Sequence, residues 1–363
     1  MLNDYTLQMV LLGSIILGIT SGMVGTFAVL RKQSLMGDAI SHSALPGLVI
    51  AFLLTSQSAS YILLIGAFAA SLLSTFIMML IVKYSNITYD GALAIILSVF
   101  FGMGMVLLSV AQKLPGASQA GLNKFLFGRA ASILYADVIM MLGLGILVLF
   151  IIILFWKEFK LLCFNNDFGE SLGLPMMFFD IILTSLLVIS IIIGLQMVGV
   201  ILMSVMIIAP PVAARQWTNK LNKMILLAGF IGALAGVGGS FISSIVPRMP
   251  TGPTIVIMNF IIVLISLVLA FERGLLSRII RRKQKINSIL AKQILFDCYK
   301  SFKKEEIISI KQIMDNLILL SAKKKKQLRY YLLKKGWLLI TNDKTEITKK
   351  GLEEILERGV LCA

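Results

Sequence analysis

The sequence predicts an all-α polytopic membrane protein of eight or nine transmembrane helices, followed by a small α+β domain. Two observations predict this fold class. First, 58% of the 363 residues are hydrophobic and the mean hydropathy is +0.92, whereas soluble domains are about 45–50% apolar. Second, the apolar residues gather in the first three quarters of the chain. We therefore expect a transmembrane domain at 1–280 and a cytoplasmic domain at 281–363.

Nine apolar segments are long enough to cross a bilayer, since a transmembrane helix needs about 20 apolar residues and at least about 17. They are expected near residues 8–30, 40–56, 61–82, 91–111, 135–156, 176–196, 198–214, 224–246 and 254–271. The segments at 40–56 and 198–214 are short, so the count is eight or nine. No basic stretch precedes the first segment, which favours a retained span over a cleaved signal peptide.

Lysine and arginine indicate the orientation, because they accumulate in short cytoplasmic loops. Trp156–Lys160, Arg215–Lys223 and Arg273–Lys283 would then be cytoplasmic, and counting back along the spans places Arg31–Lys32 there too. The basic residues within 113–134 would face outward. One further short segment there would reverse the N-terminal half, so the orientation of that half stays open.

Charge separates the two domains as hydropathy does. Residues 1–274 contain 13 Lys and Arg against 9 Asp and Glu, whereas residues 275–363 contain 21 against 9. The basic character therefore belongs mainly to the tail. The three cysteines, Cys163, Cys298 and Cys362, have spacings that suggest neither a disulfide framework nor a zinc site.

Glycine and proline interrupt several predicted spans, at Ala44–Gly47, Ala209–Pro211, Gly232–Gly239 and Pro247–Pro253. Broken helices persist at membrane depth only when they are buried in protein or line a polar cavity, and they are typical of transport sites. The alternative is that small residues let helices pack closely. For Gly232–Gly239 we favour close packing.

Asp38 and His42 are an ionisable pair inside the apolar region, where such groups are costly and mark functional sites. Four residues apart, they share one face of a helix, and a carboxylate with an imidazole can ligate a divalent transition metal. His42 is the only histidine. Alternatively, Asp38 caps the second helix and pairs with its own histidine, and the spacing leaves both open. Two copies of the chain would supply a four-ligand site.

The other acidic residues of the apolar region have a simpler interpretation. Asp90, Asp137 and Asp180 lie near predicted span ends, where helix capping is expected. Glu272 adjoins Arg273 at the exit of the last span. No phosphate-binding GxxxxGK[ST] loop occurs anywhere in the sequence, so we expect the chain to hydrolyse no ATP itself, and any ATP hydrolysis must come from a partner.

The stretch Arg31–Gly47 strongly resembles a signature of the permeases of ATP-driven manganese, zinc and iron uptake systems, the metal-uptake branch of the ABC importers. Three further motifs follow in the order of that family, at Leu126–Gly128, Asp167–Leu174 and Val198–Ala214. The resemblance extends from residue 5 to about 280. It implies the permease subunit of an importer in the bacterial inner membrane.

The family resemblance implies specific partners and sites. Two permeases, identical or paralogous, would form the pathway, an extracytoplasmic metal-binding protein would deliver the ion, and cytoplasmic ABC ATPases would drive alternating access. Asp38 and His42 match the positions proposed to contact the metal, which is cargo rather than a permanent cofactor. The motif matching the ATPase-docking helix comprises Asp167, Phe168, Gly169, Glu170, Ser171, Leu172 and Gly173. Without the resemblance, this motif would be an ordinary cytoplasmic loop.

The tail resembles a winged helix-turn-helix domain, in which three helices precede a two-stranded wing. The expected elements are helices at 289–302, 310–319 and 321–335, strands at 336–340 and 345–348, and a last helix at 349–358. A basic face on the third helix would suit DNA phosphates, and it comprises Lys323, Lys324, Lys325, Lys326 and Arg329. The alternatives are a solvated face or one held against anionic lipid.

The main hypothesis is therefore the permease of an ATP-driven importer of manganese, iron or zinc. The second hypothesis, from a different class, is a membrane-anchored regulator that binds DNA through its tail. A secondary transporter is disfavoured, because the sequence has no dense set of carboxylates within its apolar segments. The residues do not choose among the three metals.

Overall fold

The protein divides into two compact units, Met1–Gly274 and Leu275–Ala363. The computed structural model describes residues 5–55, 60–113, 128, 130, 133–246, 249–303, 328, 330–341, 344–351 and 353. The predicted domain division at 280/281 falls inside a helix, α14, of the second unit.

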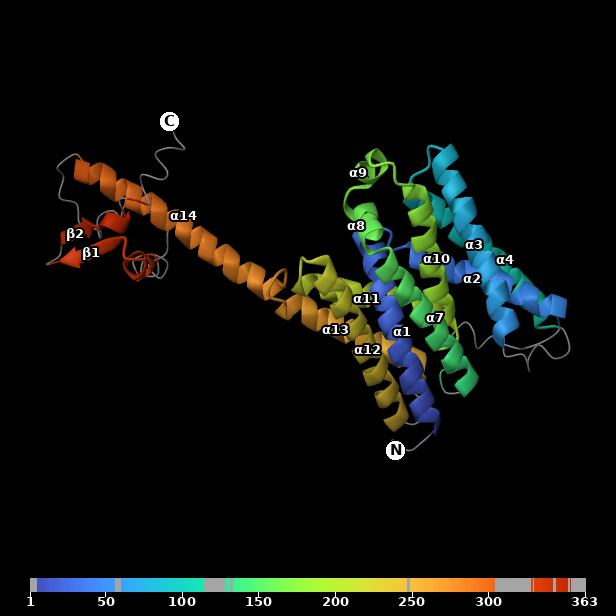
Figure 1. Ribbon diagram of the computed structural model, residues 1–363. Helices are drawn as coiled ribbons and strands as arrows, with labels where there is room; N and C mark the ends of the chain where they lie inside the picture. The colour runs from blue at the N-terminus through green and yellow to red at the C-terminus, as the bar shows by residue number, and fades with distance from the viewer. Residues whose placement is uncertain are drawn as a thin grey trace. The chain divides into compact units, whose positions relative to one another are not determined.

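The first unit is helical throughout its described part (Figure 1). Nine of its described helices are long and apolar enough to cross a membrane. They are α1 (Tyr5–Leu30), α2 (Met36–Thr55), α3 (Ser60–Tyr84), α4 (Tyr89–Ala111), α7 (Tyr135–Leu154), α10 (Met176–Leu195), α11 (Val200–Trp217), α12 (Leu221–Ile245) and α13 (Thr251–Leu269). Each predicted span coincides with one of these helices, so the upper count of nine is confirmed for this part of the chain.

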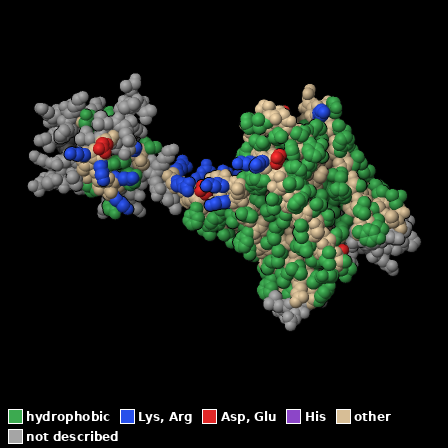
Figure 2. Space-filling model, in the orientation of Figure 1, with side chains coloured by type: hydrophobic (Ala, Val, Ile, Leu, Met, Phe, Trp, Pro, Cys, Tyr) green, Lys and Arg blue, Asp and Glu red, His purple; other side chains and the backbone are tan. Residues whose placement is uncertain are grey.

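Burial differs between the spans in a way that suits a bilayer. α1, α2 and α10 are mostly buried, whereas in α3, α4, α7 and α13 only 28% of the most apolar stretch is buried. The exposed side chains include Val106, Ile153 and Phe260, and the visible face of this unit is largely hydrophobic (Figure 2). Apolar side chains on the outside of a helical bundle are expected to face lipid. The chain is a multi-pass membrane protein.

Helix α2 begins earlier than predicted, at Met36 rather than near residue 40. The reversal from α1 to α2 is confined to the preceding residues, where the Arg31 N–H donates to Phe27 O and the Gln33 N–H donates to Ala28 O. Lys32 adopts a left-handed φ of 59° at the turn. Asp38 therefore lies within the first helical turn, because the tight turn before it completes the change of direction.

Three of the four predicted interruptions are continuous helix, and for the two that contain proline the prediction of a broken helix is wrong. α2 runs through Pro46, and α11 runs through Pro210 and Pro211. At Pro46 the adjoining helix provides a close surface, since a Cβ added to Gly104 of α4 would lie 2.9 Å from the proline Cδ. Packing of neighbouring helices compensates for the hydrogen bond that each proline removes.

The glycines of α12 serve close packing, in agreement with the favoured interpretation. A Cβ added to Gly232 would lie 2.2 Å from the carbonyl oxygen of Gly18 in α1, and one added to Gly22 would lie 2.5 Å from Ala228 O. Only residues without a large side chain allow two helices to approach so closely. α1 and α12 lie side by side along this contact (Figure 1).

Between α7 and α10 the chain forms two short helices, α8 (Trp156–Phe164) and α9 (Asn166–Ser171). An aromatic cluster holds α8 against α1, because the Phe27 ring lies 6.4 Å from that of Trp156 and 5.7 Å from that of Phe159. Phe159 and Phe27 are fully buried. This cluster positions the two short helices beside the end of α1.

The second unit contains α14 (Leu275–Lys303) and, in its described residues, an antiparallel pair of strands, β1 (Leu338–Thr341) and β2 (Lys344–Ile347). The predicted hairpin is present, shifted slightly along the sequence. The predicted helix 289–302 is the second half of α14, which is continuous because no Gly or Pro occurs within Leu275–Lys303. The buried core includes Ala291, Ile294, Leu295, Leu328, Leu332, Trp337 and Leu338.

The winged-helix interpretation of this unit remains a prediction from the sequence. The second predicted helix, 310–319, and most of the third lie outside the described residues. The described part supports only a helix, a hairpin and a small apolar core around Trp337.

Candidate metal site

Asp38 and His42 lie one turn apart on α2, as their spacing predicts. The Nε2 atom of His42 is 3.5 Å from Oδ1 of Asp38. The His42 side chain is 15% exposed and that of Asp38 is 38% exposed. The pair is therefore partly sheltered, with the carboxylate the more accessible of the two groups.

Residues from two other helices surround the pair. The His42 ring packs edge-to-face on Phe101 of α4, with ring centroids 4.6 Å apart, and Ser204 of α11 lies beside the Asp38 carboxylate. The Nδ1 atom of His42 is buried and has no hydrogen-bond partner among the described residues. Buried polar atoms are normally satisfied, so this imidazole retains unused bonding capacity.

The distance between the two side chains is compatible with a shared cation. Two ligand atoms that are each about 2.1 Å from a metal, at a tetrahedral angle, lie about 3.4 Å apart. The observed separation of 3.5 Å is close to this value. The same separation also fits a direct ion pair once His42 is protonated.

A single chain does not complete a cage for a metal ion in the described region. No group of three or more His, Cys, Asp or Glu side chains that could hold a metal occurs among the described residues. The carbonyl oxygen of His42 is a further potential oxygen ligand, because Pro46 has no N–H to donate to it within the helix. Further ligands would have to be water, hydroxyl or carbonyl oxygens, or side chains of a second copy.

The motif Asp167, Phe168, Gly169, Glu170, Ser171, Leu172 and Gly173 forms α9 and the turn after it. The Asn165 side chain caps the helix by accepting a hydrogen bond from the Phe168 N–H at 3.2 Å. Phe168 is 50% exposed and Leu172 is 58% exposed. Large exposed apolar side chains on a short surface helix and in the turn after it are suited to a protein partner.

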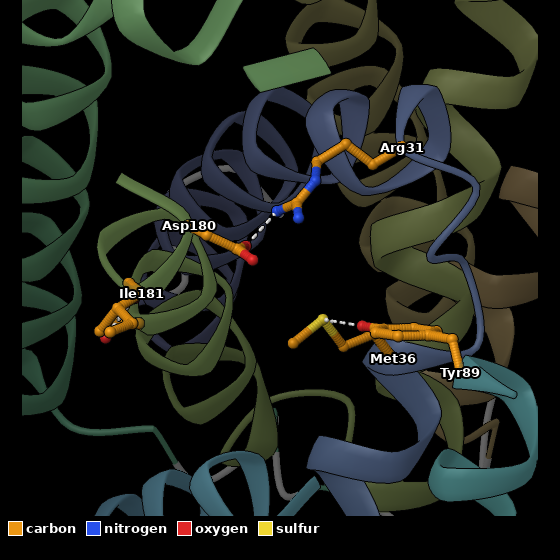
Figure 3. A network of polar contacts seen from close by, with 6 residues as sticks. Arg31, Met36, Tyr89, Asp180 and Ile181 are labelled. Carbon is orange, nitrogen blue, oxygen red and sulfur yellow. Dashed lines mark hydrogen bonds and ion pairs between the residues drawn. The ribbon is translucent and has the colours of Figure 1, made fainter. Parts of the chain in front are cut away.

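Asp180 pairs with an arginine and does not cap a helix, so the capping interpretation is wrong for this residue. Its Oδ1 accepts a hydrogen bond of 2.6 Å from Nη1 of Arg31, and the two form an ion pair (Figure 3). The residues are 149 positions apart. Sequence reasoning missed the contact because only the fold brings the end of α1 to the start of α10. The available signals were a basic residue, Arg31, at the end of one span and an acidic residue, Asp180, near the start of another.

The remaining acidic residues agree better with their predicted roles. The Asp137 carboxylate caps α7 by accepting from the Leu134 N–H at 3.2 Å. Asp90 lies in the first turn of α4, where a carboxylate interacts favourably with the helix N-terminus. Glu272 accepts a hydrogen bond from the Asn219 side chain in an exposed position.

Cys163 lies in α8, away from Asp38 and His42 in the sequence. Burial raises the pKa of the Cys163 thiol to about 12. A thiol that stays protonated at neutral pH is a poor metal ligand, since the thiolate is the ligating form. Cys163 is therefore not a candidate metal ligand.

The proposed DNA contacts in the tail lie outside the described residues. These are Lys323, Lys324, Lys325, Lys326 and Arg329. The DNA-binding interpretation therefore stays a prediction, and no contact among the described residues favours it.

The fold and the polar pair define a polytopic membrane protein with a candidate cation site among its transmembrane helices. The ABC 3 transport family model matches residues 3–270. The chain belongs to this family. It is therefore a transport permease rather than an enzyme, as predicted, and the resemblance seen in the sequence is confirmed.

Relatives and a solved structure agree with this assignment. The zinc transport system membrane protein TroC of Treponema pallidum is 48% identical over 282 residues, covering 78% of this chain and 95% of TroC. The manganese transport system membrane protein MntC of Bacillus subtilis is 39% identical over 348 residues, covering 96% of this chain and 80% of MntC. The PsaBC structure from Streptococcus pneumoniae, in complex with Fab, aligns with a TM-score of 0.68 and 33% identity, covering 78% of this chain and 96% of the matched chain.

The MntC alignment is longer than the membrane unit of this chain, which ends at Gly274. It therefore extends into the tail. The TroC alignment covers a smaller share of this chain, so similarity to the tail is a feature of only some relatives.

Proposed function

We propose that the chain is the permease subunit of an ATP-driven importer of a divalent transition metal, with Asp38 and His42 as transient ligands of the ion. The observation that supports this most directly is the spacing of the two side chains. A carboxylate oxygen and an imidazole nitrogen lie 3.5 Å apart in a helix of a family of transport permeases. Relatives named as zinc and manganese transport proteins favour a divalent cargo.

The incomplete ligand set suits transport better than storage. A closed site with four protein ligands holds its metal as a structural element, whereas a site with few ligands exchanges it. We infer that two permeases, identical or paralogous, face each other and that each contributes one Asp–His pair. An extracytoplasmic metal-binding protein would deliver the ion to this pathway. The relatives include both a zinc and a manganese system, and a carboxylate with an imidazole also suits iron, so manganese, iron and zinc are all candidates.

The energy for transport would come from a separate cytoplasmic ATPase that docks on α9. The exposure of Phe168 and Leu172 supports a protein partner at this surface. The Arg31–Asp180 pair places the basic α1–α2 turn at the same end of the bundle as the start of α10, close to α9 in sequence. The α1–α2 turn carries Arg31 and Lys32, and α8, which directly precedes α9, carries Lys157 and Lys160. We therefore place this end, and the basic tail that follows Arg273, in the cytoplasm.

The direct experiment is metal uptake by bacteria that lack their other manganese and zinc importers. The permease would be expressed with its ATPase and binding protein. Loss of one ligand is expected to reduce uptake at least about 10-fold, the range seen when metal sites lose a supporting group. Asp38→Ala and His42→Ala test the two ligands. Asp90→Ala is a matched control, because Asp90 also lies in the first turn of a span but is exposed.

Uptake by Asp38→Ala and His42→Ala at the level of Asp90→Ala would remove the site assignment. Absence of metal uptake by the unaltered importer, with all three components present in the membrane, would overturn the proposed function itself.

A further inference from the structure

The docking helix α9 and the start of α10 form one stiff corner. The Leu174 N–H donates to Gly169 O at 3.2 Å and the Met176 N–H donates to Leu174 O at 2.8 Å. A Cβ added to Gly169 would lie 2.5 Å from the Met176 sulfur, so α9 lies directly against the first residue of α10. The Phe179 ring packs on Phe155, with centroids 5.6 Å apart. A displacement of α9 therefore moves the first turns of α10.

Asp180 lies in these first turns of α10 and is bound to Arg31. The bond is short, 2.6 Å, and the side chains of Arg31 and Asp180 are only 12% and 32% exposed. Figure 3 shows the two side chains pointing toward each other, Arg31 from the end of α1 and Asp180 from α10. Charge-assisted hydrogen bonds are stronger than neutral ones, and breaking a sheltered pair leaves charges without compensation. Arg31 is thus expected to move together with Asp180 when α10 shifts.

Arg31 opens the tight turn that leads into α2. The Met36 N–H donates to Gln33 O at 3.1 Å, and the Tyr89 hydroxyl donates to the Met36 sulfur at 3.2 Å (Figure 3). Met36 is fully buried and precedes Asp38 by two positions. Tyr89 is the first residue of α4, the helix whose Phe101 packs on His42. The turn therefore connects directly to both candidate ligands.

The space beside the ion pair allows such a displacement. A cavity of about 250 Å³ lies between the start of α10 and helices α2, α3 and α4, and residues lining it include Gln33, Met36, Tyr89, Met177, Asp180 and Thr184. Close-packed interiors resist movement, whereas a cavity leaves α10 room to shift. The Arg31–Asp180 pair bridges α10 and the α1–α2 turn at the edge of this space.

We propose that the Arg31–Asp180 ion pair couples movement of the α9–α10 corner to α2, so that ATPase docking and hydrolysis change the positions of Asp38 and His42. Arg31 and Asp180 act as positioning residues and do not touch the transported ion. The inference rests on the proposed function, because it assumes an ATPase at α9 and a cation at α2. It adds the specific contact that joins the two sites.

The test must separate coupling from a merely structural role. The importer is reconstituted in vesicles, and manganese transported per ATP hydrolysed is measured together with co-purification of the ATPase. Arg31→Met and Asp180→Asn each remove one charge. The double variant Arg31→Met with Asp180→Asn removes both, which avoids leaving one buried charge unpaired. The swapped variant Arg31→Asp with Asp180→Arg restores an ion pair in reverse.

Each single variant and the double neutral variant is expected to keep its ATPase bound but to transport at least about fivefold less metal per ATP, the lower end of measured coupling between sites. The swapped variant is expected to recover most of the loss. If the double neutral variant transports as much manganese per ATP hydrolysed as the unaltered importer, the proposal is overturned and the ion pair has only a structural role. A swapped variant no better than the single variants would also overturn it, because the pairing would not matter.

This outcome is distinguishable from failure of the proposed function. The amount of manganese transported per ATP hydrolysed reports on coupling only if the unaltered importer transports manganese and if Asp38→Ala reduces that transport. If both conditions hold and the ratio is insensitive to Arg31 and Asp180, the coupling proposal alone fails.

Discussion

Small or polar residues interrupt apolar helices in two regions, the crossing of α1 with α12 and the first turns of α2. The two regions differ in whether their buried polar groups have hydrogen-bond partners. On the α1 side of the crossing, hydroxyl groups bond to their own helix, as when Ser21 donates to Leu17 O at 2.6 Å, and the glycines lie against backbone. On α2, by contrast, the His42 Nδ1 atom is buried without a partner in the described part of the chain. In this protein, small residues within a span indicate close packing, whereas a buried ionisable group without a partner indicates a site.

The largest effect is expected at the crossing. Gly18→Leu would place a Cβ 2.3 Å from the Gly232 backbone, so the helices must separate. Overpacking a tight contact costs about 1–3 kcal/mol and sometimes more. We expect little folded protein after detergent extraction and a lower melting temperature. The matched control is Gly143→Leu on α7, where the described atoms leave open space within 4 Å. Equal melting temperatures for the two variants would contradict the packing account.

A smaller and more selective effect is expected at Phe101. Phe101→Leu removes the edge-to-face contact with His42, an interaction typically worth about 0.5–1.5 kcal/mol. The metal concentration for half-maximal uptake should therefore rise about 2- to 10-fold, while melting changes little. Phe150→Leu on α7 is the control, because Phe150 is an exposed aromatic residue of a span. If Phe101→Leu lowers the melting temperature but leaves the metal concentration for half-maximal uptake unchanged, Phe101 serves packing alone.

The membrane spans were predictable because length and hydropathy are local properties of the sequence. Each of the nine predicted segments became a helix in the described structure. The predicted start of the second span, near residue 40, lies later than the start of α2 at Met36, because hydropathy detects the apolar part of a span and not the polar first turn that contains Asp38. Proline at Pro46 and Pro210 was overinterpreted, because neighbouring helices can stabilise a helix that has lost one hydrogen bond.

The candidate site was only partly predictable. The spacing of Asp38 and His42 determined that they share a helix face, but not that Phe101 and Ser204 would surround them. The Arg31–Asp180 pair depends on the tertiary fold, since its members come from opposite halves of the membrane unit. In the tail, the alternation of apolar and polar residues predicted the hairpin. The first half of α14 was missed, because the basic residues that follow the last span were interpreted only as its polar flank.

The most direct measurement of the central claim is equilibrium binding of manganese to the purified permease pair. The account predicts one ion for every two chains, and Asp38→Asn and His42→Gln should each weaken binding at least about 10-fold, with Asp90→Asn unchanged. Unaltered manganese affinity in both Asp38→Asn and His42→Gln, in protein that melts normally, would contradict the account.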